Sequence, residues 1–414
     1  MAPWRLTNRA VLANVNLRLG SAIVQMMRHR EFLLSRRRLL QSLAMLPAGA
    51  ALVSAGVVAV GAEDHATPGD ATLQHFAKAV PKAELHIHIE GVTGPELAFV
   101  LAERNRVQLP FSSPREFADT LVFDSLDSFL AGYEQMMSVL LTGEDFHDVV
   151  LQYLEKAADA GIVYAEMHFD PQAHLVRDIP FEEVMEGITA GQRAGMERYG
   201  VRSRLIMAFQ RDRDLDSARQ ALAYAGEYRD LIVGLGLDNY EIPDFPSKFV
   251  DVYREGAEAG FQLTSHCDLD VPGSIDHIRG CIEQLGVSRL DHGYSLFEDE
   301  SLIAVCRERG IGFTACPTTD WGLRDVTEDY YASAVNASVR KMLDLGLRVG
   351  LNTDDPGLMG GRYLDDVYQD TARALRLSAA EIVQLSRNAF ESSWAPPAEK
   401  REYLRQLDEF ASNA

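Results

Sequence analysis

Residues 83–91 read AELHIHIEG, a short apolar run that ends at polar residues. In a strand, His86 and His88 would project from the same face, because side chains two positions apart do so. Seven further apolar runs follow, most of them separated by amphipathic stretches typical of helices, at 163–169, 204–209, 231–237, 261–267, 288–294, 312–317 and 348–354. This alternation predicts an α/β fold of the (β/α)8 TIM-type barrel class.

Two parts of the chain are longer than simple strand–helix alternation requires. The stretch 111–151 exceeds an ordinary crossover, and we expect it to supply inserted helices over the C-terminal mouth of the barrel. Residues 378–414 predict one or two closing helices, interrupted by a pair of prolines. We therefore expect the barrel at 82–414, preceded by a linker at 63–81.

Residues 1–62 are expected to lie outside the barrel. They carry eight arginines against one acidic residue, and the arginines at 36–38 precede an apolar stretch at 43–62 rich in Ala, Val and Gly. A basic segment, an apolar segment and a small-residue exit predict a cleaved twin-arginine export signal and a periplasmic location. The alternatives are an uncleaved membrane anchor and a translation start at Met26 or Met27.

The composition is that of an ordinary globular protein, with 47% hydrophobic and 24% charged residues. The net charge is -21, and the remainder of the chain is more acidic still because its first 62 residues are basic. Such a surface argues against nucleic acid or an anionic membrane as a partner. No C-x-x-C pair occurs, so we expect buried free thiols at Cys267, Cys281, Cys306 and Cys316.

Polar residues at the ends of distant strands predict a metal site. His266 ends the fifth predicted strand and Asp354 ends the eighth. With His86 and His88 they would supply three imidazoles and one carboxylate, a set that suits one Zn²⁺ with an open position for water. Zinc lowers the pKa of such a water towards about 7. A single histidine is most simply a hydrogen-bonded core residue, but this combination predicts a metal-dependent hydrolase.

From about Lys82 to Trp394 the chain resembles the adenosine/adenine deaminase family of the amidohydrolase superfamily. The likeness is carried by AELHIHIEG, YAEMHFDPQAH, GLDNYEIPDFPSKF, RLDHGY and LNTDDP. It implies that the four ligands named above bind one zinc ion. It also implies that His292 orients and deprotonates the attacking water, and that Asp355 hydrogen-bonds that water or purine N7. The implied reaction is attack of water at purine C6 with loss of ammonia.

The resemblance also bears on the substrate. Adenosine deaminases typically carry an aspartate that reaches the ribose 5′-hydroxyl, where this chain has Glu90. Together with FDPQAH and LDNYEIP, this resembles the adenine-type subgroup and implies conversion of adenine to hypoxanthine and ammonia. We expect Asp238 and Glu241 to contact the substrate together with Glu90 and Asp355. Alternatively, Glu90 is a charge at the barrel rim and the substrate is adenosine or an N6-substituted adenine.

One segment departs from the family pattern. The family usually has His-Ala-Gly-Glu after strand five, and its glutamate protonates purine N1. Here the run is HCDLD, with Leu269 at the glutamate position, so we expect Asp268 or Asp270 to supply the acid unless both are merely solvated. The missing glutamate leaves a catalytically inactive, deaminase-fold binding protein as an alternative. Retention of His292 and of the metal-ligand set argues against that alternative.

A different metal hydrolase, cleaving an amide or a phosphoester, is a third possibility. Binuclear relatives commonly use a bridging carboxylated lysine on the fourth strand. The fourth predicted strand, 231–237, reads LIVGLGL and holds no lysine. This favours a single metal ion and a deaminase.

Overall fold

The computed structural model describes residues 68–123, 126–267, 273–317 and 328–413. The expected export signal at 1–62 lies outside these ranges, and so do Asp268 and Asp270. Within the described ranges, no helix is both long and apolar enough to cross a membrane.

Parallel strands form the interior of the fold. They pair in the orders β1-β2-β3-β4-β5 and β6-β7-β8-β9, so that neighbours in space are neighbours along the chain. This order is what repeated strand–helix units produce. The strands are β1 Lys82–Glu84, β2 Ile162–Phe169, β3 Arg202–Gln210, β4 Ile232–Asp238, β5 Gln262–Leu263, β6 His266–Cys267, β7 Arg289–His292, β8 Gly312–Ala315 and β9 Arg348–Leu351.

Backbone hydrogen bonds join the two sheets into one closed barrel. Thr264 and Ser265 separate β5 from β6, yet Thr264 donates its N–H to β4 (2.9 Å) and the Ser265 carbonyl accepts from β7 (2.9 Å). β5 and β6 are therefore two parts of one barrel strand. At the other seam, His88 donates to the Asp354 carbonyl (3.0 Å) and Asp354 donates to the His86 carbonyl (3.1 Å). The predicted (β/α)8 barrel is confirmed.

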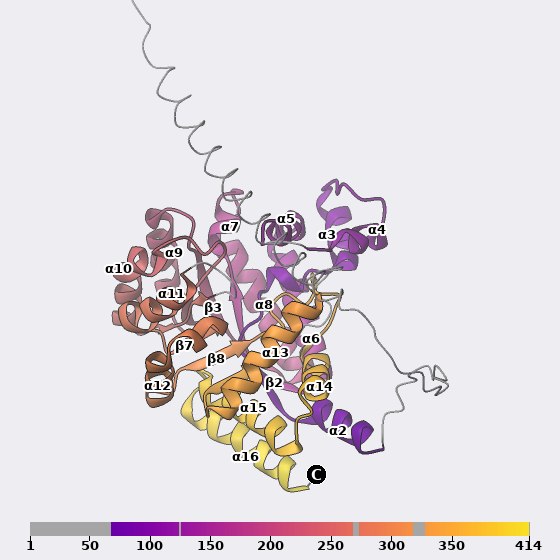
Figure 1. Ribbon diagram of the computed structural model, residues 1–414. Helices are drawn as coiled ribbons and strands as arrows, with labels where there is room; N and C mark the ends of the chain where they lie inside the picture. Colours follow the sequence, from indigo (N-terminus) through magenta and orange to yellow (C-terminus); the bar gives the residue numbers. More distant parts are fainter. Residues whose placement is uncertain (1–67, 124–125, 268–272, 318–327, 414) are drawn as a thin grey trace, which may run out of the picture. The chain divides into compact units, whose positions relative to one another are not determined.

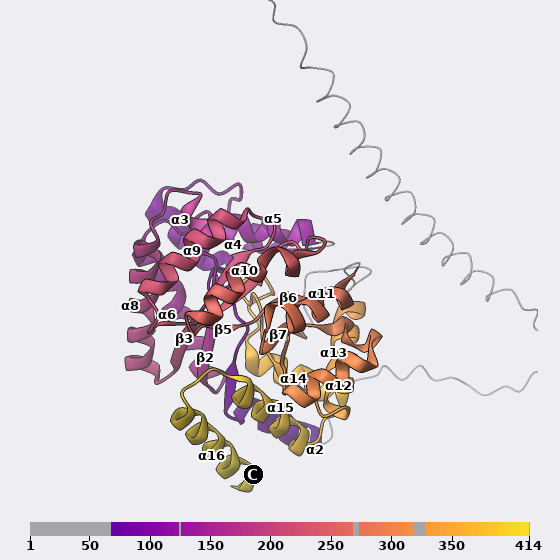
Figure 2. The same ribbon diagram turned by 90° about the vertical axis from the view of Figure 1, so that its left-hand side faces the viewer.

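Helices surround this barrel, and further helices lie at its two ends. Figures 1 and 2 show α3, α4 and α5 at one end and α2, α15 and α16 at the other. The helices are α2 Pro68–Ala79, α3 Pro95–Asn105, α4 Pro114–Thr120, α5 Leu126–Met137, α6 Gly143–Asp159, α7 Pro171–Leu175, α8 Phe181–Tyr199, α9 Leu215–Glu227, α10 Phe245–Glu258, α11 Ser274–Gly280, α12 Glu300–Arg309, α13 Glu328–Asp344, α14 Leu364–Leu375, α15 Ala379–Ser392 and α16 Pro397–Asn413.

The structure confirms one expectation about the helices and corrects another. The closing helices at 378–414 are confirmed as α15 and α16, with the proline pair between them. The expected linker at 63–81, in contrast, contains α2, which packs against α14 and α15. The ring of Phe76 on α2 lies 5.1 Å from that of Phe410 on α16. The packed body therefore begins before residue 82.

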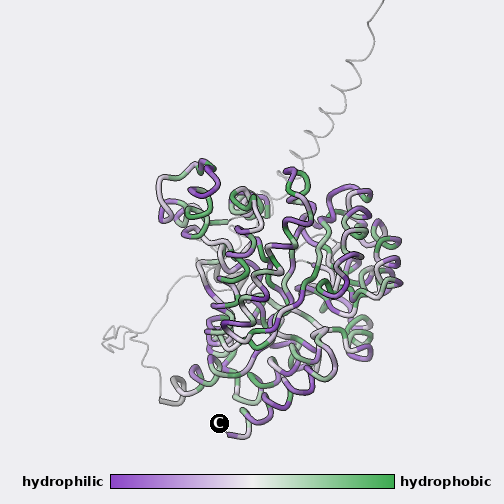
Figure 3. Tube along the Cα trace, turned by 180° about the vertical axis from the view of Figure 1, so that it is seen from behind, coloured by the Kyte–Doolittle hydropathy of each residue, from purple (hydrophilic) through white to green (hydrophobic). Residues whose placement is uncertain are grey.

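The core follows from strands that are covered on both faces. Leu205 to Phe209 on β3 are all fully buried, as expected for a barrel strand with side chains inside and helices outside. Figure 3 shows hydrophobic segments through the middle of the molecule and hydrophilic turns on many outer helices. All four cysteines are buried and free, as predicted.

A buried ion pair lies inside the barrel. Arg289 Nη1 of β7 lies 2.5 Å from Glu166 Oε2 of β2, and neither side chain is exposed. Glu166 also accepts a hydrogen bond from Tyr164 (2.9 Å), and the Arg289 guanidinium lies 3.8 Å from the ring centre of Trp394. These contacts join β2 to β7, the strand that ends in His292.

Candidate metal centre and substrate cavity

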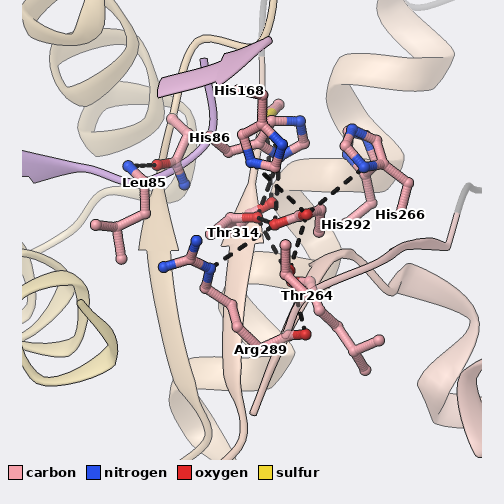
Figure 4. A network of polar contacts seen from close by, with 12 residues as sticks. Leu85, His86, His168, Thr264, His266, Arg289, His292 and Thr314 are labelled. Carbon is pink, nitrogen blue, oxygen red and sulfur yellow. Dashed lines mark hydrogen bonds and ion pairs between the residues drawn. The ribbon is translucent and has the colours of Figure 1, made fainter. Parts of the chain in front are cut away.

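Histidines and an aspartate from four barrel strands converge at the carboxyl ends of those strands, and Figure 4 shows His86, His266 and His292 among them. His86 Nε2 lies 3.1 Å from Asp354 Oδ1, and His88 Nε2 lies 3.5 Å from the same oxygen. The Nε2 atoms of His88 and His266 are 3.2 Å apart, and His292 Nε2 is 3.6 Å from Asp354 Oδ2. All five residues are buried. The structure thus brings together the five residues predicted as metal ligands and base.

Local backbone geometry helps to aim two of these side chains. His292 and Asp354 have φ angles of 66° and 65°, in the left-handed region that residues other than glycine seldom adopt. His292 is the last residue of β7, and Asp354 lies three residues beyond the end of β9. Such strained positions persist where surrounding contacts determine them, and they are common at functional sites.

The donor set matches a divalent cation. Ligand atoms of His86, His266, His292 and Asp354 all lie within 4.8 Å of one another, and His88 contacts this group through His266 and Asp354. Imidazole nitrogens that face each other so closely cannot all hydrogen-bond to one another, whereas a shared metal ion would bind them together. The selection of His86, His88, His266 and Asp354 as the ligands stays a prediction, with His292 beside them.

Charges within the cluster suit this interpretation. Burial opposes ionisation of Asp354, but His86 and His292 outweigh it and hold the carboxyl pKa well below its usual range. Burial, reinforced by the neighbouring imidazoles, holds the pKa of His266 well below its usual value. Burial opposes protonation of His86, but Asp354 outweighs it and raises the pKa of that imidazole to about 9, so metal binding would release a proton from this ring.

Asp291 supports the cluster from behind. Its carboxylate accepts hydrogen bonds from Thr264 Oγ1 (2.9 Å) and Thr314 Oγ1 (2.7 Å), and it lies 3.5 Å from His266 Nδ1. His86 Nδ1 lies 3.1 Å from Thr314 Oγ1. Burial opposes ionisation of Asp291, but His86 and other nearby positive groups lower its pKa to about 2. Such outer contacts orient metal-binding imidazoles.

A cavity of about 580 Å³ opens over the cluster. His88, His266, His292 and Asp354 lie on its wall, and α5 covers it with apolar side chains. The expected inserted helices therefore include one that lines the barrel mouth. A concave, mostly apolar cavity with a few convergent polar groups is typical of a small-molecule site. The apolar residues of α5 on the wall are Leu126, Phe129, Leu130, Tyr133 and Met137.

Two of the predicted substrate contacts lie on the cavity wall. Asp355 is buried, its Oδ1 receives no hydrogen bond from the described residues, and burial and Asp354 raise its pKa well above the usual range. Asp238 also lines the cavity, and burial raises its pKa to about 7. Both can present polar atoms to a ligand.

The other two predicted contacts, Glu90 and Glu241, each lie beside a histidine, and their contact with substrate stays a prediction. Glu90 Oε1 lies 2.7 Å from His174 Nε2 and accepts the Asp170 backbone N–H (3.0 Å). Glu241 Oε1 lies 2.6 Å from His277 Nδ1. Neither glutamate lines the cavity.

Sequence reasoning missed Asp170 and Asp291. Asp170 follows β2 and lines the cavity, so the rule that marked the other strand ends could have found it. Asp291 lies inside the apolar run of β7, immediately before His292. A charged residue in a buried strand is unusual unless it has a partner, and that could have marked Asp291 as functional.

A closed parallel barrel with imidazoles and a carboxylate at its strand ends defines a metal-dependent hydrolase of the amidohydrolase type. Residues 81–410 match the family described as adenosine deaminase. The chain belongs to this family.

Proteins similar to this chain include an uncharacterised deaminase and several adenine deaminases. It is 38% identical to an uncharacterised deaminase of Schizosaccharomyces pombe, over 82% of this chain and 98% of the relative. It is also 38% identical to an adenine deaminase of Chlorobium luteolum, over 82% and 97% of the two chains.

Solved structures of an adenine deaminase and an amidohydrolase are also similar to this chain. The adenine deaminase of Arthrobacter aurescens superposes with a TM-score of 0.75 at 36% identity, covering 81% of this chain and 100% of that one. An amidohydrolase from Burkholderia ambifaria with bound zinc gives a TM-score of 0.72 at 27% identity, covering 85% and 96%.

Proposed function

We propose that the protein is a zinc-dependent deaminase that converts adenine and water to hypoxanthine and ammonia. The observation that carries this proposal is the convergence of His86, His88, His266, His292 and Asp354 at the floor of a cavity of small-molecule size. Adenine deaminases 36–39% identical over at least 80% of the chain support the choice of substrate. The reaction breaks an exocyclic C–N bond of a cyclic amidine.

Each residue has a role in this proposal. His86, His88, His266 and Asp354 would hold one zinc ion, which would supply an activated water at neutral pH. His292 faces the same point and accepts the proton of the attacking water, as a positioned imidazole can near neutral pH. Asp355, on the wall beside Asp354, orients the purine through N7.

Attack at C6 also requires a proton at purine N1, so that the ring nitrogen does not gain negative charge. In the sequence Asp268 directly follows β6 and Asp270 comes two residues later, and we assign the acid to one of them. The leaving ammonia takes up the proton that His292 removed from water, and the remaining C6 hydroxyl proton returns to the acid as the carbonyl of hypoxanthine forms. Water and adenine are thereby consumed, and hypoxanthine and ammonia are formed.

A substrate panel on the chain from Glu63 onwards tests the proposal. Ammonia release is measured for adenine, adenosine and N6-methyladenine, with zinc determined in the same sample. Turnover of adenine with about one zinc per chain is expected. Turnover of adenosine or N6-methyladenine alone would keep the chemistry and change the substrate. Bound zinc without ammonia from any purine would favour an inactive binding protein.

We further propose that residues 1–62 direct the folded enzyme to the periplasm by the twin-arginine route. The arginines at 36–38 and the apolar stretch that follows them support this location. Conversion of Arg36 and Arg37 to lysine should retain the protein in the cytoplasmic fraction. Unchanged fractionation would contradict the proposal.

A further inference from the structure

Two buried carboxylates stand together on the cavity wall, beside the metal cluster. Asp170 follows β2 and Asp238 ends β4, and their side chains come close although 68 positions separate them in the chain. One ligand atom from each, together with one from His88, all lie within 4.8 Å of one another. Asp170 is 3% exposed and Asp238 is 4% exposed.

The oxygens of this pair have few donors. Asp170 Oδ1 and both carboxylate oxygens of Asp238 are buried and receive no hydrogen bond from the described residues, apart from the one that the two carboxyls form with each other when either is protonated. Buried polar atoms are nearly always satisfied, because one left without a partner lowers the stability of the fold. Since both residues line the cavity, a ligand with an N–H group would supply the missing donor.

The surrounding structure fixes Asp170 in place. Its backbone N–H donates to Glu90 Oε1 (3.0 Å), and Glu90 is held by His174 Nε2 at 2.7 Å. His174 Nδ1 in turn lies 2.6 Å from Arg177 Nη2. Glu90 is therefore a positioning residue that acts on the cavity through Asp170.

Asp238 is fixed through its backbone. Its carbonyl accepts the N–H of Arg211 (3.2 Å), and the Arg211 side chain donates to the carbonyls of Asn239 and His266. A site that is already fixed loses little conformational freedom when a ligand binds.

We propose that Asp170 and Asp238 form a subsite that accepts the imidazole N–H of a free purine base and thereby selects bases over N9-substituted purines. The inference rests on the proposed function for its substrate. Asp238 Oδ2 lies 3.9 Å from His88 Nδ1, on the side of that ring away from the Nε2 that faces the cluster. A purine whose C6 is at the cluster would extend its imidazole half towards this pair.

The selectivity follows from donors and acceptors. Adenine carries an N–H on its imidazole half. In adenosine and 9-methyladenine the hydrogen on N9 is replaced by a carbon substituent, so this donor is absent. The N9-substituted compound leaves the carboxylates without a donor and adds bulk beside them. Sites built to bind an N–H or O–H group reject analogues that lack it far more strongly than apolar pockets reject a missing methylene.

The test compares adenine with 9-methyladenine on the zinc-loaded wild type and on Asp238→Ala, Asp238→Asn and Asp170→Ala. The alanine variants should lower kcat/KM for adenine about 10- to 100-fold, mainly through KM, because the contact is remote from the reacting carbon. Their rates on 9-methyladenine should hardly change. Asp238→Asn should recover part of the loss, since its amide oxygen still accepts. Asp216→Asn, whose side chain is 96% exposed, is the charge control.

Equal losses on adenine and 9-methyladenine would overturn the inference, as would an unchanged preference between them. Two zinc ions per wild-type chain, with one lost in Asp238→Ala, would assign the pair to a metal and also overturn it. If the wild type deaminates no purine, the proposed function fails, but the subsite can still be tested. Binding of hypoxanthine and 9-methylhypoxanthine is then measured by calorimetry. If the wild type and Asp238→Ala bind hypoxanthine with equal affinity, the subsite is refuted.

Discussion

Replacement of Gly91 by alanine should disable the site without touching a metal ligand. A Cβ atom at Gly91 would lie 1.8 Å from Asp355 Oδ1 and 2.6 Å from its Cγ. Ordinary contacts between carbon atoms are about 3.5–4.0 Å. The Asp355 carboxyl or the backbone must therefore move by roughly 1.5–2 Å to reach an ordinary contact.

The backbone offers little room for that movement. Gly357 donates its N–H to the Gly91 carbonyl (2.8 Å), so the two segments on either side of the barrel seam are tied together. A misplacement of about 1 Å near reacting groups can lower turnover about 100-fold. We expect Gly91→Ala to lower kcat/KM for adenine at least that much, and to cost about 1–3 kcal/mol of stability through overpacking.

The assay measures kcat/KM for adenine, bound zinc and the free energy of unfolding for Gly91→Ala and Gly226→Ala. Gly226 lies in α9, and a Cβ there would meet nothing within 4 Å, so the control should keep wild-type turnover. Wild-type kcat/KM in Gly91→Ala would refute the reasoning, because it would show that Asp355 can be displaced without consequence.

Three further predictions follow from the supporting contacts. Asp291→Asn should weaken zinc binding about 10- to 100-fold in chelator competition, since its carboxylate orients two imidazoles; unchanged affinity would contradict this role. Arg289→Met should cost about 3–5 kcal/mol in urea unfolding, because it leaves Glu166 buried without its partner, and a loss below 1 kcal/mol would be inconsistent with that. Dialysis against a chelator should abolish ammonia release and added Zn²⁺ should restore it, whereas persistent turnover in metal-free protein would exclude the metal mechanism.

The strands and the histidine cluster were predictable because simple periodicities govern them. Side chains two positions apart share a face, which placed His86 beside His88, and parallel strand ends meet at one side of a barrel, which brought in His266 and Asp354. The left-handed backbone of His292 could not be read from its neighbours, because residues other than glycine seldom adopt it.

Other features depend on partners far away in the chain. Glu90 lies behind the cavity wall because His174, 84 positions later, binds it there, and Glu241 is drawn to His277 in the same way. No local sequence pattern predicts these glutamate–histidine pairs. The packing of α2 on the barrel likewise depends on α14 and α15, which follow almost 300 residues later.

Zinc content and ammonia release from adenine, measured on the same samples of wild type and Asp354→Ala, test the central claim most directly. Asp354 is the one carboxylate in the predicted ligand set and lies within 3.6 Å of His86, His88 and His292. The account predicts about one zinc per chain and deamination in the wild type, and loss of both in the variant. A metal-free variant that deaminates adenine at the wild-type rate would contradict it.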